Sequence, residues 1–78
     1  EGDAVVDRSD IVRIIERTLN LKEQLTEDAS METVAKWDSL NQLYIIMNIE
    51  KELKVKFAID RIPDLNSVEA IWQEIQML

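Results

Sequence analysis

The chain has 78 residues, with 16 acidic and 9 basic side chains and a formal net charge of −7. A chain of this length forms one domain that buries only about 60 to 65% of its unfolded surface, so we expect no large internal active site. The charge argues against nucleic acid or an anionic membrane as partner, because both bind clustered Lys and Arg. A basic protein surface is the partner that it favours.

Cysteine and histidine are both absent. The first absence excludes a disulfide framework and thiolate metal sites, and it permits a reducing cytoplasm. The second removes the commonest zinc ligand and any pairing of a nucleophile with a histidine base. The sequence also contains no apolar run of transmembrane length and no signal-peptide pattern. We therefore expect a cytoplasmic protein with no metal site, no membrane span and no catalytic activity of its own.

Residues 1–6 carry no helical pattern, and we expect a flexible terminus followed by one domain over residues 7–78. A first helix is predicted from Asp7 or Ser9, either of which can cap it. Its arginines, Arg8 among them, lie on the face expected to be solvated. The apolar positions recur at steps of three and four residues, which is typical of an amphipathic helix: Ile11, Val12, Ile14, Ile15 and Leu19.

Residues 20–37 form a connection that is long for so small a domain, unless it packs on the core or has a function. Spaced apolar residues indicate that it packs: Leu21, Leu25, Met31, Val34 and Trp37. The next helix begins at Asp38 and Ser39. Asp38 suits the N-cap, and Ser39 at the first helical position has an exposed hydroxyl near the positive end of the helix dipole.

The second predicted helix, from Ser39 to about Lys54, is too apolar for burial on one side only. One stripe runs along its whole length and is expected to face the core: Ile45, Ile46, Ile49 and Leu53. A shorter stripe lies on roughly the opposite side: Leu40, Leu43, Tyr44 and Met47. Because one core can bury only one of the two stripes, the shorter one is expected to be an exposed apolar patch beside Ser39.

Residues 54–65 show an alternation of apolar and polar residues, but no partner strand exists for them. We expect a loop and then a short helical turn, which Pro63 limits. The last helix is capped by Asn66 or Ser67, and Asn66 with Glu69 fits a capping box. Its predicted buried face is Val68, Ile71, Trp72, Ile75 and Leu78. The predicted fold is all-α: a small four-helix bundle with a long first loop and a short irregular third helix.

The tripeptide Asp38-Ser39-Leu40, followed by an apolar helix with Glu50 and Glu52, resembles the phosphopantetheine attachment motif of acyl carrier proteins. The length of the chain and the order of its elements fit that family without an obvious insertion. The resemblance implies that a phosphopantetheinyl transferase attaches 4′-phosphopantetheine from coenzyme A to Ser39, with Asp38 helping to position the enzyme. The arm would then carry acyl groups as thioesters, and the chain would be a substrate of other enzymes, not an enzyme.

The same resemblance assigns further residues. The interface with the transferase and with acyl-loading and acyl-processing enzymes, whose docking surfaces would be basic, is expected at Leu40, Asn41, Leu43, Tyr44, Met47 and Glu50. A pocket for the acyl chain is expected among Met31, Ile46, Ile49, Phe57, Ile62, Leu65 and Ile71. Ile62 and Ile71 lie where smaller residues are frequent in fatty-acid carriers, which predicts short or polar cargo. A monomer is expected.

The chain departs from the common fatty-acid pattern near the motif. Lys36 lies where glycine is frequent, and Asn41, Tyr44 and Lys51 lie where acids are usual. These departures favour a specialised pathway over general fatty-acid synthesis. Two alternatives stay open: a peptidyl or aminoacyl carrier that uses the same serine, and an unmodified helical module that binds partners through the apolar patch alone.

Overall fold

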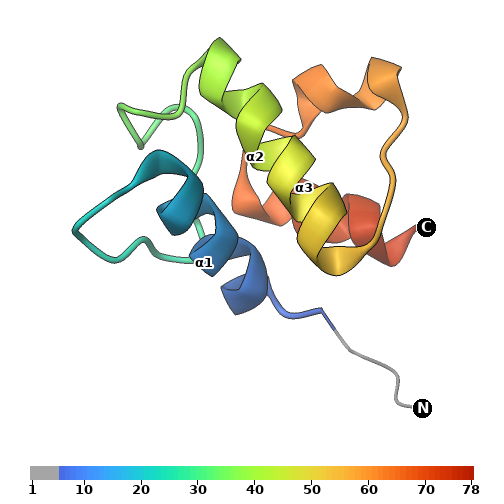
Figure 1. The fold of residues 1–78 in the computed structure, drawn as a ribbon, viewed down its shortest axis with the longest axis horizontal. Coiled ribbons are helices and arrows are strands. Elements are labelled where there is room, and N and C mark those ends of the chain that lie inside the picture. Colours follow the sequence, from blue (N-terminus) through green and yellow to red (C-terminus); the bar gives the residue numbers. More distant parts are fainter. Residues whose placement is uncertain (1–5) are drawn as a thin grey trace.

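Four helices make up the computed structural model, which describes residues 6–78 (Figure 1). They are α1 (Arg8–Leu19), α2 (Ser39–Leu53), a short 3₁₀-helix η1 (Ile59–Asp64) and α3 (Val68–Gln76). Within these residues the β-type pairing is a single isolated bridge between Ser30 and Ser67. The all-α class, the long first connection and the short irregular third helix are therefore confirmed.

Helix α1 packs against both α2 and α3, so it lies at the centre of the core. Asp7 is its N-cap, and the Asp10 carboxylate accepts a hydrogen bond from the Asp7 N–H at 3.0 Å. Every position of the predicted apolar stripe is buried: Ile11, Val12, Ile14, Ile15 and Leu19. The helix ends at Asn20, whose left-handed conformation (φ 54°) suits an asparagine at a helix C-terminus.

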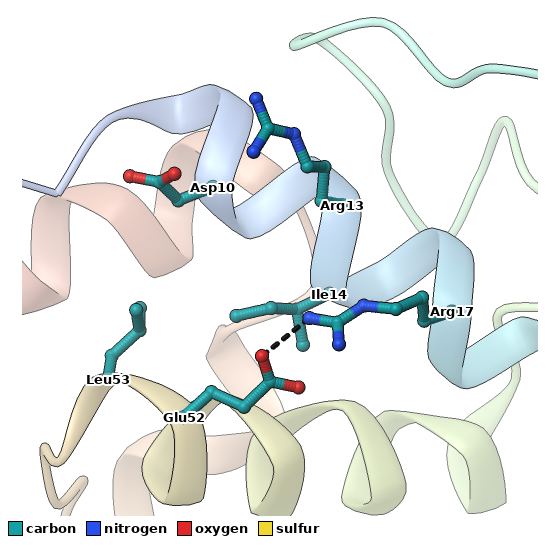
Figure 2. A pocket seen from close by; sticks show the side chains of 6 residues that line it. All are labelled: Asp10, Arg13, Ile14, Arg17, Glu52 and Leu53. Atoms are coloured by element: carbon teal, nitrogen blue, oxygen red, sulfur yellow. Dashed lines mark hydrogen bonds and ion pairs between the residues drawn. The ribbon is translucent and has the colours of Figure 1, made fainter.

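Helix α2 buries the long stripe of the two predicted from its sequence. Ile45, Ile46 and Ile49 are buried, and Leu53 is half-buried against the same core. Near its C-terminus α2 meets α1, where Arg17 donates a hydrogen bond to Glu52 at 2.5 Å. Figure 2 shows this polar edge of the α1–α2 contact, with Arg17 directed toward Glu52 across the gap between the two helices. The edge is exposed, so this ion pair contributes little to stability.

The connection between α1 and α2 packs on the core, as predicted. Ala29, Val34 and Trp37 are buried, and Leu21, Leu25 and Met31 are half-buried against the core. Two backbone hydrogen bonds hold its middle to the start of α3: Met31 N–H to the Asn66 carbonyl (2.9 Å) and Val68 N–H to the Ala29 carbonyl (3.0 Å). A loop held at its middle in this way gives the residues before Ser39 a fixed path.

Residues 55–58 and η1 form the predicted loop and helical turn, with Pro63 inside the turn. The loop is attached to α2 by the Glu50 carboxylate, which accepts a hydrogen bond from the Phe57 N–H at 2.9 Å. Phe57 is buried beside this bond. Glu50, which the resemblance placed at the partner interface, is half-buried and serves as an internal acceptor.

Two predictions about the ends of α3 are wrong. Ser67 is the N-cap, since its hydroxyl accepts a hydrogen bond from the Ala70 N–H at 3.0 Å, so the predicted capping box of Asn66 and Glu69 is wrong. Leu78 was expected on the buried face, but α3 ends at Gln76 and Leu78 is 62% exposed. Val68 and Ile71 are buried as predicted.

Glu69 pairs with α1 instead of capping its own helix. Its carboxylate accepts two hydrogen bonds from the Arg8 guanidinium, at 2.6 and 3.1 Å, and the guanidinium lies 3.9 Å from the ring centroid of Trp72. The expectation of a solvated Arg8 is therefore wrong. The hydrogen bonds from Arg8, and a weaker contribution from the Gln73 amide, hold the pKa of Glu69 below its ordinary value.

Val6 belongs to the segment expected to be flexible, but it packs on the core. The expected flexible terminus over residues 1–6 falls outside the described residues at 1–5. Val6, however, is half-buried against the core, and its carbonyl accepts a hydrogen bond from Trp72 Nε1 at 3.0 Å. Val6 therefore packs with the domain.

Candidate functional site

The N-terminus of α2 is fixed by two groups of hydrogen bonds. The Asp38 carboxylate accepts from the Asn41 N–H at 2.8 Å, which confirms Asp38 as the N-cap, and the Asp38 carbonyl accepts from the Gln42 N–H at 2.8 Å. The Asn41 side chain donates to the Lys36 carbonyl at 2.7 Å. Asn41, expected at the partner interface, is half-buried and holds the turn before the helix in place.

Ser39 follows this cap as the first residue of α2, and it is exposed. The unpaired N–H groups of the first turn and the helix dipole make this end of α2 favourable for an anionic group such as a phosphate. Ser39 is also among the residues that line a surface hollow, so its side chain is accessible.

A hollow of about 360 Å³ begins at Ser39 and extends between α2, η1 and the first connection. Figure 1 shows η1 beside the N-terminal part of α2, and the hollow lies where these two elements meet the loop that leads into α2. Apolar side chains form most of its wall. Its lining residues are Met31, Ser39, Gln42, Leu43, Ile62 and Pro63.

The seven residues expected to form an acyl pocket divide into two groups. Met31 and Ile62 line the hollow. The other five are at most 2% exposed and belong to the core: Ile46, Ile49, Phe57, Leu65 and Ile71. The structure thus brings Ser39 together with only two of the seven. It adds Leu43, which was expected at the partner interface, and Pro63, which was not expected at the site.

Gln42 is the residue of this site that sequence reasoning missed. It is 4% exposed, and its side-chain oxygen accepts a hydrogen bond from Trp37 Nε1 at 2.6 Å. Its amide nitrogen donates to the carbonyls of Ile62 (2.9 Å) and Leu65 (2.5 Å). The helical spacing of the sequence does indicate that Gln42 is buried. It precedes Ile45, Ile46 and Ile49 by three, four and seven residues, so it lies on the same face of the helix.

The shorter apolar stripe of α2 is exposed, as predicted. Its members are between 49% and 61% exposed, and we call them the α2 apolar patch: Leu40, Leu43, Tyr44 and Met47. All four lie within the first nine residues of α2, on the helix that begins with Ser39. Exposed apolar side chains of this size that lie together on one helix face are typical of a surface that binds other proteins.

A second hollow, of about 190 Å³, lies at the opposite end of α2 and is drawn in Figure 2. Arg13, Arg17, Asp10 and Glu52 line it together with two apolar residues, so charges of both signs face it. Its position near Glu52 is about 20 Å along the helix from Ser39, at a rise of about 1.5 Å per residue. It therefore belongs to a different surface from the candidate site.

In residues 6–78 no group of three or more His, Cys, Asp or Glu side chains is arranged to hold a metal ion. The sequence has no histidine to act as a base for the hydroxyl. Over the same residues, no helix combines the length and the apolar character needed to cross a membrane. The site can present a hydroxyl group and an apolar surface to another protein.

Comparison with models of protein families, with curated proteins and with solved structures gives no match for this chain.

Proposed function

We propose that this chain is an acyl carrier protein, which carries acyl groups as thioesters on a 4′-phosphopantetheine arm attached to the Ser39 hydroxyl. The observation that carries the proposal is the position of Ser39: exposed, first in α2, behind the fixed Asp38 cap, and in the wall of a largely apolar hollow. A helix start favours the phosphate of the arm, and the hollow offers apolar contacts to what the arm carries.

The attachment chemistry needs no base from this chain. The Ser39 oxygen attacks the phosphorus of coenzyme A that bears the pantetheine arm, a phosphodiester forms, and the adenosine bisphosphate portion leaves. A phosphopantetheinyl transferase accepts the hydroxyl proton. The absence of histidine agrees with this division of roles, because the serine is a substrate. The arm then supplies a thiol to a chain that contains no cysteine.

The partners that fit are the transferase and enzymes that load and process acyl groups. A net charge of −7 favours basic docking surfaces, and the α2 apolar patch provides contact area next to the attachment point. Asn41, Tyr44 and Lys51 reduce the acidity of this helix, which supports a specialised pathway over general fatty-acid synthesis. We place this monomeric carrier in the cytoplasm.

The test is the intact mass of the protein after incubation with coenzyme A and a broad-specificity transferase. The unchanged sequence is expected to gain the mass of one phosphopantetheine group, and Ser39→Ala is expected to gain nothing. Ser9→Ala is the matched control, because Ser9 is also a serine in the first turn of a helix capped by Asp. This control should be modified like the unchanged protein.

Two outcomes contradict the proposal: modification of Ser39→Ala, or no modification of the unchanged protein. In the second case the α2 apolar patch is the remaining functional feature, and an unmodified interaction module becomes the better description. If modification occurs, loading assays with acyl and aminoacyl donors separate an acyl carrier from an aminoacyl or peptidyl carrier. Ser39→Ala itself should leave the melting temperature nearly unchanged, because an exposed first-turn hydroxyl is replaced by a good helix former.

A further inference from the structure

Gln42 is the only buried polar or charged side chain in the part of the chain that the structure describes, and it forms the inner wall of the hollow at Ser39. Both hydrogens of its amide are used, one on the Ile62 carbonyl and one on the Leu65 carbonyl. Its oxygen is bound by Trp37 Nε1. This one side chain of α2 thus binds Trp37 in the segment before Ser39 and the C-terminal part of η1, through the carbonyls of Ile62 and its C-cap Leu65.

The interior behind Gln42 is apolar and closely packed. Ile46 and Ile49 follow on the same face of α2, and the Leu65 side chain is buried as well. An acyl chain that passed from the hollow into this interior would have to separate the Gln42 amide from the two carbonyls of the η1 segment. An apolar chain offers no replacement partners, and unpaired buried polar groups are strongly unfavourable.

We propose that Gln42 determines which cargo this protein carries. Its hydrogen bonds hold η1 against α2 and confine the group carried at Ser39 to the surface hollow. The hollow can then bury short acyl chains but not long ones. The inference rests on the proposed carrier function, since it concerns a group attached at Ser39. Met31, Leu43 and Ile62 supply the apolar wall against which a short chain packs, and Gln42 is the buried residue among those that line the hollow.

The experiment places alkyl chains at residue 39 without any transferase. Because the chain has no cysteine, Ser39→Cys introduces a single thiol. Its thiolate attacks the sulfenyl sulfur of an ethyl, hexyl or decyl methanethiosulfonate, a disulfide to the alkyl group forms, and methanesulfinate leaves. Intact mass verifies each adduct. This labelling does not require that Ser39 is modified naturally. A failure of the Gln42 proposal can therefore be distinguished from a failure of the proposed carrier function.

Thermal melting of the adducts measures how much of each chain is sheltered. With Gln42 present, we expect the hexyl adduct to melt above the ethyl adduct and the decyl adduct to show no further rise. With Gln42→Ala or Gln42→Met added, the decyl adduct should melt about 5 °C or more above the hexyl adduct, because additional methylenes become buried. The indole N–H resonance of Trp37 should shift on decyl labelling in these variants only.

Asn48→Ala is the matched control. Asn48 is another amide on α2, half-buried, but it donates to the Thr18 hydroxyl on α1 at 2.8 Å, away from the hollow. With Asn48→Ala and Gln42 unchanged, the decyl adduct should still melt no higher than the hexyl adduct. Gln42→Met keeps most of the side-chain volume and loses the hydrogen bonds, so it carries the comparison if Gln42→Ala does not fold. A decyl adduct stabilised beyond hexyl with Gln42 in place, or the same length limit in both Gln42 variants, would overturn the proposal.

Discussion

Ser39 and Gln42 lie three residues apart on α2, and their surroundings assign them opposite roles. Ser39 is exposed at the helix start, whereas Gln42 is buried and all of its amide hydrogens are used. The Asp38 cap holds the first turn that contains both, because its carboxylate accepts from the Asn41 N–H and its carbonyl from the Gln42 N–H. The start of α2 therefore has one exposed serine and one buried amide that holds η1.

Tyr44 tests whether the α2 apolar patch binds partner enzymes. It is 49% exposed, so Tyr44→Ala should change the free energy of unfolding little. Aromatic side chains often dominate transient interfaces, and we expect kcat/KM for modification by a phosphopantetheinyl transferase to fall by about 5- to 30-fold, or about 1 to 2 kcal/mol. The loss should persist at high salt, because contact with an apolar surface is not screened.

Leu78→Ala is the control for this measurement, since Leu78 is an exposed apolar residue beyond the end of α3. It should leave kcat/KM unchanged. Unchanged modification of Tyr44→Ala together with a large fall in its melting temperature would show that Tyr44 supports the fold instead of an interface.

Features of single residues could be predicted where they depend on neighbours in the sequence, and not where they depend on residues distant in the chain. The exposure of Ser39 and of the patch could be predicted because both depend on the cap and on the period of a single helix. The role of Gln42 could not, because its carbonyl partners lie 20 and 23 residues further along the chain. The acyl pocket was expected from the family resemblance, and five of its seven residues are core residues, because matching positions do not indicate which side chains the core of this chain buries.

At the scale of elements, α1 and α2 both end in a residue with left-handed conformation. Asn20 has φ 54° and Lys54 has φ 57°. Asparagine tolerates this region better than lysine, and glycine adopts it without the steric penalty of a Cβ atom. We expect Lys54→Gly to stabilise the protein by about 0.5 to 1 kcal/mol in urea unfolding.

Asn20→Gly provides the comparison, and its gain should be smaller than that of Lys54→Gly. If Lys54→Gly were destabilising, contacts of the lysine side chain would outweigh the relief of backbone strain. The measurement therefore separates the backbone conformation at the C-cap of α2 from the side-chain contacts of Lys54.

The ends of α3 show how contacts between elements override local patterns. The sequence Asn66-x-x-Glu69 satisfies the capping-box pattern, yet Ser67 caps the helix and Glu69 pairs with Arg8, 61 residues earlier in the chain. A carboxylate beside a guanidinium gains more from two charge-assisted hydrogen bonds than from a backbone N–H. The long apolar stripes of α1 and α2 were predicted correctly because nothing distant competes with burial in one core.

At the scale of the whole molecule, Arg8, Glu69 and Trp72 close the fold by joining its two ends. Arg8 begins α1, Glu69 and Trp72 belong to α3, and Trp72 Nε1 also binds the Val6 carbonyl. The pKa of Glu69 is lower in the folded protein than its ordinary value of 4.5, chiefly because Arg8 donates to its carboxylate. The group therefore contributes stability that is fully present above about pH 5, near the ordinary value, and is lost as the pH falls through the lowered pKa.

A double-mutant cycle on this pair tests the linkage. Glu69→Gln should lower stability at pH 7 and flatten the decline of stability below about pH 5, measured as the urea midpoint across the acid range. Once Arg8→Gln is present, adding Glu69→Gln should have much less effect on that decline, because the partner that lowers the pKa is gone. The pair is partly exposed, so the difference should shrink with added salt. Equal effects of Glu69→Gln with and without Arg8 would contradict this linkage and would assign the pKa shift of Glu69 to Gln73, the other side chain that donates to its carboxylate.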